Sequence, residues 1–293
     1  MPLLALAMVL LAACTHATWN YWAKRAAASR HIVWLYSVGS AVLYAPIVAW
    51  ILVFHRPEFT TAQCLALLAT GVLHMGYSLL LQAGYRVSDL SLVYPIARGT
   101  GPLLSFLAAT FFLGEPANSL SVLGVVLVVG GILLVSGLVM SGTTGSHLKA
   151  PRAGVAFGLL IGVFIAAYTI NDGWAVKVLM ISPFIVDFTG NLLRIVLLAP
   201  RALGNRAELM QEARQYRTSI IVVSVLGPLG YILVLFAMQI APIGHVAPAR
   251  ELATLVGSYF GVKLLKERMT PQRVIGAVLI VGGVVSLSIT RPA

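Results

Sequence analysis

Two arginines stand inside apolar segments of the chain, where few roles suit a charged side chain. Arg98 and Arg250 lie 152 residues apart. An arginine at the centre of a membrane span costs at least about 2.5 kcal/mol, so it should line a wet cavity, pair with a carboxylate, or both. A guanidinium group also holds a carboxylate or a phosphate with two parallel hydrogen bonds. The two arginines therefore predict an anion-binding site; the alternative is a structural ion pair, for example of Arg250 with Glu251.

The segment around Arg98 is unusual for a membrane span because prolines and glycines surround the arginine. Pro95 and Pro102 each lack a backbone donor, and two glycines lie between them. A span interrupted in this way leaves backbone groups that need partners within the protein or in a water-filled cavity. We expect Tyr94, at the start of this stretch, to contact substrate together with the two arginines.

A second set of polar residues recurs at the same offset in the first and sixth predicted spans. His16 and Asn20 lie four residues apart, on one helical face, and the offset takes them to Tyr168 and Asp172. Together with Trp19, they are expected to line an aqueous path and contact substrate. His16 or Asp172 could bind a coupling proton. The alternatives are a histidine used in packing and an aspartate hydrated at the end of its span.

Two further carboxylates are candidates for coupling beside Asp172. Asp187 precedes Arg194 by seven residues, which is too far for a direct pair along one helix. Each should therefore meet another helix or the cavity. Glu251 follows the second cavity arginine directly. Weaker candidates for the cavity wall are His74, Tyr77, Gln82 and Tyr231.

The composition requires a membrane protein to carry these residues. Hydrophobic residues make up 59% of the 293 positions, charged residues make up 10%, and the mean hydropathy is +0.93. Such a chain has too little polar surface to cover a water-soluble globule. Apolar runs of about 20 residues predict an all-α integral membrane protein. The ten expected spans lie at about 3–22, 32–54, 62–83, 90–113, 119–138, 153–174, 182–200, 218–239, 243–264 and 272–290.

The chain nearly repeats itself at the offset of 152 residues. Ten of the 24 positions from Leu113 to Ser136 are identical to those 152 residues later. We therefore divide the chain into a first five-helix repeat at residues 1–140, a linker at 141–152 and a second five-helix repeat at 153–293. The other long connection is the charged stretch from residue 201 to 217.

The basic residues indicate the orientation of the chain and not a nucleic-acid partner. The net charge is +11, but the 20 lysines and arginines are scattered over short loops. In the ten-span arrangement 14 of them fall on one side, three fall on the other and three lie within spans. The positive-inside rule places the 14 in the cytoplasm and both termini outside. Because each repeat has an odd number of spans, the second repeat should be inverted relative to the first.

The remaining motifs mainly exclude functions. Cys14 and Cys64 are too few for a disulfide framework or a metal cluster, and we expect no metal and no cofactor. The stretch before Cys14 looks like a lipoprotein cleavage site, but no basic residue precedes it and the apolar helix continues, so we expect no cleavage. No phosphate-binding loop, no G-x-S-x-G and no H-E-x-x-H motif is present, which disfavours an ATP-driven pump and an enzyme.

Glycines recur in the fifth and tenth predicted spans, at positions 124, 130 and 131 and again at 276, 282 and 283. Small residues allow membrane helices to approach closely. Packing between these two spans is the expected role, and a homodimer contact is the alternative.

Several of these features resemble the EamA family of the drug/metabolite transporter superfamily. They are the signature Phe112-Leu-Gly-Glu-Pro116 with the glycines that follow it, and its echo Leu265-Lys-Glu-Arg268. The resemblance covers the whole chain. It implies a multi-pass bacterial inner-membrane carrier for small metabolites, often an exporter, with a central cavity between two repeats. The echo departs from the family pattern, because Lys266 and Arg268 replace the glycine and the proline.

The function we expect is secondary transport by alternating access, with export as the direction. The solute would be anionic or zwitterionic, bound between the inverted repeats near Arg98 and Arg250. Proton coupling and a homodimer stay open, and the small-molecule substrate and the lipid bilayer are the expected partners. The alternatives are a non-transporting scaffold or receptor and an intramembrane lipid-modifying enzyme.

Overall fold

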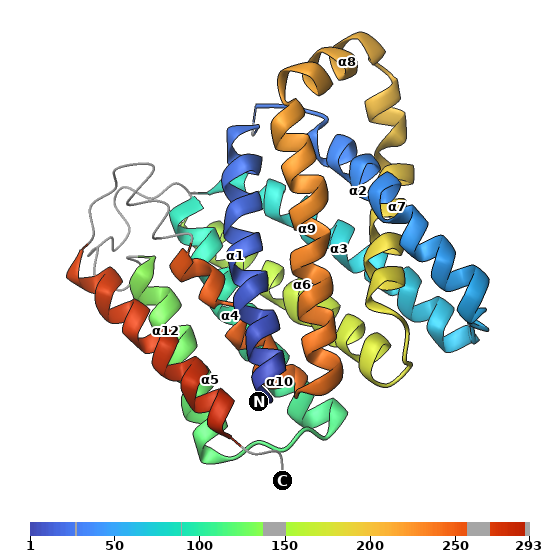
Figure 1. Ribbon diagram of the computed structural model, residues 1–293. Helices are drawn as coiled ribbons and strands as arrows, with labels where there is room; N and C mark the ends of the chain where they lie inside the picture. The colour runs from blue at the N-terminus through green and yellow to red at the C-terminus, as the bar shows by residue number, and fades with distance from the viewer. Residues whose placement is uncertain (27, 89, 137–150, 257–269, 291–293) are drawn as a thin grey trace.

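The structure is a computed structural model, and it describes residues 1–26, 28–88, 90–136, 151–256 and 270–290 (Figure 1). Within these residues the chain forms helices and no strands. This confirms the all-α class.

The helices keep the labels of Figure 1 throughout. They are α1 (Leu3–Arg25), α2 (Ile32–Trp50), α3 (Thr61–Val87), α4 (Leu90–Leu113), α5 (Ser119–Val135), α6 (Pro151–Lys177), α7 (Pro183–Leu203), α8 (Arg206–Gln215), α9 (Arg217–Ile240), α10 (Ile243–Ala249) and α12 (Pro271–Ile289). A π-helical turn at Ile51–His55 extends α2.

Eight of the described helices are long and apolar enough to cross a membrane, and α5 is apolar but shorter. The predicted ninth span, 243–264, begins as α10, but residues 257–264 lie outside the described part, as do residues 141–150 of the predicted linker. The chain is a multi-pass membrane protein, and the number of ten spans stays a prediction.

Helix starts are fixed by side chains that satisfy the first free backbone donors. Thr60 Oγ1 accepts a hydrogen bond from Gln63 N at 3.3 Å, and Gln63 Oε1 accepts one from Thr60 N at 2.9 Å. Asn118 and Ser121 form the same reciprocal pair, with both bonds at 2.9 Å, before α5. These capping boxes satisfy free backbone donors at the N-termini of the two helices, so the sequence sets where α3 and α5 begin.

The two halves of the chain, residues 1–140 and 153–293, are packed into each other. Helix α1 of the first half packs on α9 of the second. The matching helices with the halves exchanged are α6 and α3, which also pack together. Helix α2 packs on α7, and α5 packs on α12, which lie side by side in Figure 1. Most helices therefore bury their faces against the other half, as a pseudo-two-fold arrangement of repeats requires.

The glycines predicted to pack do so between α5 and α12. A Cβ atom on Gly131 would lie 2.6 Å from the carbonyl oxygen of Gly276, and one on Gly283 would lie 2.5 Å from that of Gly124. The residue numbers rise along one helix and fall along the other, so the two helices are antiparallel. The packing role is confirmed for these four glycines, whereas Gly130 and its counterpart 282 meet nothing within 4 Å.

Gly131→Ala should force α5 and α12 apart, because the added methyl group would overlap a backbone carbonyl. We expect a loss of roughly 1–3 kcal/mol in the free energy of unfolding, measured by thermal unfolding in detergent. Gly130→Ala is the matched control, since its Cβ meets no atom within 4 Å. Equal stability of the two variants would show that the helix contact is looser than described.

The charged connection between residues 201 and 217 folds as a helix, α8, at the end of the bundle away from the chain termini (Figure 1). Asn205 caps this helix, because its Oδ1 accepts a hydrogen bond from Glu208 N at 3.2 Å. Sequence reasoning treated this stretch only as a connection, since it is too polar and too short to span the membrane.

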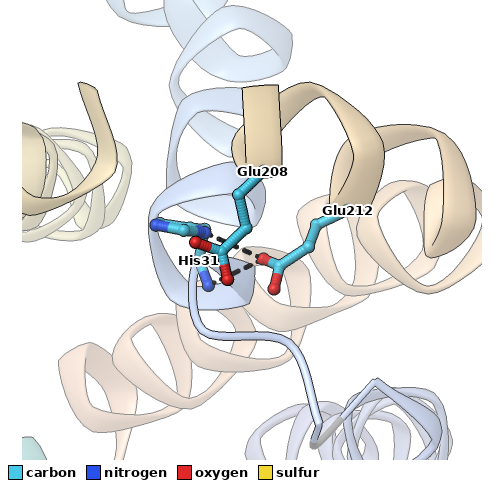
Figure 2. A group of neighbouring side chains, drawn as sticks. All are labelled: His31, Glu208 and Glu212. Carbon is cyan, nitrogen blue, oxygen red and sulfur yellow. Dashed lines mark hydrogen bonds and ion pairs between the residues drawn. The ribbon is translucent and has the colours of Figure 1, made fainter. Parts of the chain in front are cut away.

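Glu212 of α8 fastens the second half of the chain to the start of α2 (Figure 2). Its Oε1 accepts a hydrogen bond from Arg30 N at 3.0 Å. Its Oε2 accepts bonds from Ser29 Oγ at 2.7 Å and from His31 N at 3.0 Å, and it lies 2.9 Å from His31 Nδ1. His31 precedes α2 and makes no side-chain cap of its own. We call these four residues the Glu212 clasp.

The clasp should make stability depend on pH. Burial raises the pKa of Glu212, but the hydrogen bonds from Arg30, Ser29 and His31 outweigh it and bring the pKa to about 2. A pKa lowered by folding stabilises the protein above the unfolded value, and this contribution is lost as the pH falls toward the folded value.

Glu212→Gln should lower the free energy of unfolding by roughly 1–3 kcal/mol at neutral pH, because charge-assisted bonds to backbone amides are weakened. The gap in Tm between native protein and variant should narrow between about pH 5 and pH 3. The control is Glu208→Gln, since Glu208 is more exposed and lies 3.8 Å from Arg30. A gap that stays constant over this range would contradict the assignment.

Candidate functional site

A cavity of about 190 Å³ lies between the two halves of the chain. Helices α1, α2, α3, α4, α6, α7 and α9 contribute to its wall, together with the turn after α10. Its polar and aromatic lining residues are His16, Trp19, Tyr36, Ser40, His74, Tyr77, Arg98, Tyr168, Asp187, Asn191, Arg194, Tyr231 and Arg250. The structure therefore brings both predicted arginines to one cavity.

Arg98 is held by a carboxylate from the other half of the chain. Its Nε lies 3.1 Å from Glu251 Oε2, and the Glu251 side chain is 1% exposed. The N–H of this nitrogen is not aimed at the oxygen, so the contact is an ion pair without a hydrogen bond. The ion-pair alternative thus holds for Arg98, and Glu251 pairs with it and not with its neighbour Arg250.

Arg250 differs from Arg98 because it has no such partner. Its Nε is buried without a hydrogen bond, and none of the ion pairs among the described residues includes it. Its guanidinium carbon lies 6.0 Å from the ring centre of Tyr168. An aromatic face attracts a cation only weakly. No described carboxylate therefore neutralises the charge of Arg250 at ion-pair distance.

Asp172 is buried and fully partnered, so it is not the hydrated aspartate considered as an alternative. Its Oδ1 accepts hydrogen bonds from Thr70 Oγ1 at 2.6 Å and from Asn171 Nδ2 at 3.0 Å. Its Oδ2 lies 2.9 Å from His74 Nε2 and accepts a bond from the Tyr231 hydroxyl. The side chain has no exposed surface. The carboxylate is thus stabilised in its charged form by neighbours from α3, α6 and α9.

His74 connects this cluster to the cavity. Its ring stacks on Tyr168, with the ring centres 4.3 Å apart, and Tyr77 meets the same tyrosine edge-on at 5.7 Å. Sequence reasoning gave His74 only a weak role, because the offset of 152 residues takes it to Leu226. The signal that could have found it is the spacing of Thr70 and His74, four residues apart on one face of an apolar helix.

The third predicted carboxylate, Asp187, lies on the cavity wall with Asn191 and Arg194. Asn191 Nδ2 donates a hydrogen bond to Asp187 Oδ2 at 2.8 Å. Arg194 keeps a buried Nε without a hydrogen-bond partner. This face of α7 therefore presents both a carboxylate and a guanidinium to the cavity.

The remaining predicted residues lie at different distances from the cavity. His16 and Trp19 line it, with their rings 5.0 Å apart and edge to face. Asn20 is exposed on the outside of the bundle and does not belong to the lining. Tyr94 is 38% exposed and also outside the lining, and the guanidinium of Arg98 lies 5.7 Å from its ring. Substrate contact by Asn20 and Tyr94 stays a prediction.

Glu115 of the Gly-Glu-Pro signature caps the helix that leads to the second arginine. Its Oε1 accepts hydrogen bonds from Ile243 N and Lys177 Nζ, both at 2.8 Å, and its Oε2 accepts one from Gly244 N at 2.8 Å. Gly114 has a φ of +66°, which favours glycine and turns the chain between α4 and this cap. A carboxylate at a helix N-terminus is stabilising.

The capping role of Glu115 is not visible in the sequence, where this residue only marks the repeated signature. Its counterpart Glu267 lies outside the described residues. The cap fixes the start of α10, and Arg250 follows at the end of this short helix.

One group in the described part of the chain has the residue types of a metal site. It consists of His31, Glu208 and Glu212, whose ligand atoms lie within 4.8 Å of one another (Figure 2). Both oxygens of Glu212 already accept hydrogen bonds from the start of α2. The arrangement ties α8 to the residues that precede α2, and no role for a metal follows from it.

The fold is shared with solved structures. Twenty-nine chains of known structure match. One of them, described only as "Crystal structure of protein", has a TM-score of 0.72 and 15% sequence identity, and the match covers 97% of this chain and 98% of that chain. At this identity the likeness shows the fold alone. No curated protein matches the chain.

The family is shown by the sequence as a whole. The model of the EamA-like transporter family matches residues 3–137 and again residues 152–289. The two matches fall on the two halves that pack into each other around the cavity. The chain therefore belongs to the EamA-like transporter family, a family of membrane transporters for small molecules.

Proposed function

We propose that the protein is a secondary transporter that binds a small anionic or zwitterionic solute in the cavity and moves it by alternating access. The observation that carries this proposal is Arg250, a buried guanidinium on the cavity wall with no ion-pair partner among the described residues. Arg98 is already neutralised by Glu251. A buried cation without a counter-ion is costly, so its retention at a cavity suggests a ligand that supplies the missing charge.

Across the cavity wall and the residues directly behind it, positive and negative side chains are equal in number, although no described carboxylate lies within ion-pair distance of Arg250. They are three arginines and three carboxylates, namely Arg98, Arg194, Arg250, Asp172, Asp187 and Glu251. A lone anion would upset this balance, whereas a zwitterion would not. We therefore place the anionic group of the solute at Arg250 and an ammonium group, where the solute has one, at Asp187.

Alternating access is supported by the way in which the halves pack. Helices α5 and α12 run antiparallel, and the pairs α1 with α9 and α6 with α3 are related by exchange of the halves. Inverted repeats with a central site are the usual architecture of carriers that expose one site to either side in turn. The proposal includes ten spans, a bacterial inner membrane with the basic loops inside, and export as the physiological direction.

Arg250→Gln should abolish most transport, because it removes the cation while keeping a polar, though shorter, side chain. A bond between a guanidinium and a carboxylate contributes about 1.5–3 kcal/mol, so the apparent affinity should fall by roughly 10- to 100-fold. The measurement is counterflow in proteoliposomes with a panel of radiolabelled L-amino acids and organic carboxylates.

Arg214→Gln is the matched control, since Arg214 is an exposed arginine of α8 and does not belong to the cavity lining. Normal flux in Arg250→Gln would contradict the anion site while leaving a carrier. No flux of any solute in correctly inserted native protein would favour a scaffold or receptor.

Asp187→Asn should separate two classes of solute. If Asp187 holds an ammonium group, counterflow of an amino acid should fall at least about tenfold, while that of the matched carboxylate without the amino group should change little. Asn keeps a side chain of nearly the same volume beside Asn191. An equal loss for both solutes would instead assign Asp187 to the structure of the cavity wall.

A further inference from the structure

We propose that His74, held by Asp172, is a proton-binding site whose occupancy is linked to that of the anion site at Arg250. The inference rests on the proposed function, because it concerns how transport of that solute is driven. It adds a ligand, the proton, and a residue that the repeat pattern does not reveal.

The pair is built so that the imidazole and not the carboxylate changes its proton. Asp172 accepts four hydrogen-bonding contacts and has no exposed surface, so its charge is fixed in place. Because Asp172 Oδ2 accepts at His74 Nε2, the neutral ring carries its proton on that nitrogen. Nδ1 is then the basic nitrogen, and His74 belongs to the cavity wall.

His16 is less suited to this role than His74. Both rings line the cavity, but His16 meets Trp19 edge-on, and its interactions among the described residues include no carboxylate. A neighbouring carboxylate is what stabilises an imidazolium in a site of low polarity. The matched positions of the first half are also informative, because the offset that leads from Asp172 to Asn20 leads from His74 to Leu226. The pair of His74 and Asp172 is therefore present in the contact of α3 with α6 and has no counterpart in the related contact of α9 with α1.

Tyr168 links the proton site to the anion site. Its ring centre lies 4.3 Å from that of His74 and 6.0 Å from the guanidinium carbon of Arg250. The two cationic groups are therefore at most roughly 10 Å apart, and at an effective dielectric constant of about 20 one charge opposes the other by about one order of magnitude in binding. An anion on Arg250 removes this opposition. Anion and proton should consequently bind together.

Other charged and titratable groups around the pair act on both states. They come from α3, α4, α7, α9 and the turn after α10, and they are Tyr77, Arg98, Asp187, Arg194, Tyr231 and Arg250. Arg98 is neutralised by Glu251, and Asp187 lies beside Arg194. Arg250 is the group whose charge the solute changes directly.

When a proton binds together with the anion, the loaded carrier bears one negative charge less than it would with the anion alone. Such a carrier accumulates the anion on the alkaline side of a membrane and releases it from a cell in which the solute is concentrated. The coupling thus accommodates export down a solute gradient as well as uptake driven by a proton gradient.

The test separates coupling from transport. Proteoliposomes with native protein, loaded at alkaline pH and placed at acidic pH, should accumulate the labelled carboxylate that gives the highest counterflow. His74→Gln should lose accumulation, and whatever counterflow it retains should no longer depend on external pH. His55→Gln is the control, because His55 is exposed and lies outside the cavity lining.

A second measurement guards against a variant that merely fails to transport. In weakly buffered detergent solution, saturating carboxylate should cause proton uptake by the native protein and by His55→Gln, but not by His74→Gln. Accumulation or proton uptake that survives in His74→Gln would overturn the inference. Native counterflow that is insensitive to a pH gradient would overturn it and leave the carrier intact, whereas absence of native counterflow would remove the proposed function itself.

Discussion

A charged side chain inside a bilayer cannot be hydrated by bulk water, and this constraint decides where each buried charge of the protein lies. Arg98 lies against Glu251, and Asp172 is enclosed by four hydrogen-bonding side chains. Glu115 is shared between Lys177 and the start of α10. Against this background Arg194 and Arg250 stand apart, because neither belongs to an ion pair among the described residues, and Arg250 is the more buried of the two. The helix packing serves to keep it at the cavity and to keep hydrocarbon away from it.

The contacts that position the cavity charges cross between the two halves. Glu115 follows α4 but caps α10, Glu251 follows α10 but pairs with Arg98 of α4, and Asp172 of α6 binds His74 of α3. Movement of one half against the other would therefore change electrostatic partners and not only packing. This gives a physical route from solute charge to conformation, because a solute that engages Arg250 changes the field in which the neighbouring pairs are held.

The sequence predicted the membrane class, the repeat and the convergence of both arginines on one region, because apolar length and internal identity depend on the chain alone. It could not predict which carboxylate meets which arginine. Arg250 and Glu251 lie in the turn that follows α10, and only the conformation of this turn shows that Glu251 meets Arg98 and not its neighbour. His74 was undervalued because comparison of the repeats finds residues that recur, whereas its matched position is Leu226. Asn20 and Tyr94 were chosen for their place in the repeat or the motif, and neither belongs to the cavity lining.

The interleaving of α1 with α9 and of α3 with α6 means that neither half has an interior of its own. What serves as the core of a globular domain is here an interface, of the kind found in obligate dimers whose subunits are not stable alone. A pocket between two such halves can carry different side chains on its two sides, as it does with His74 from the first half and Arg250 from the second.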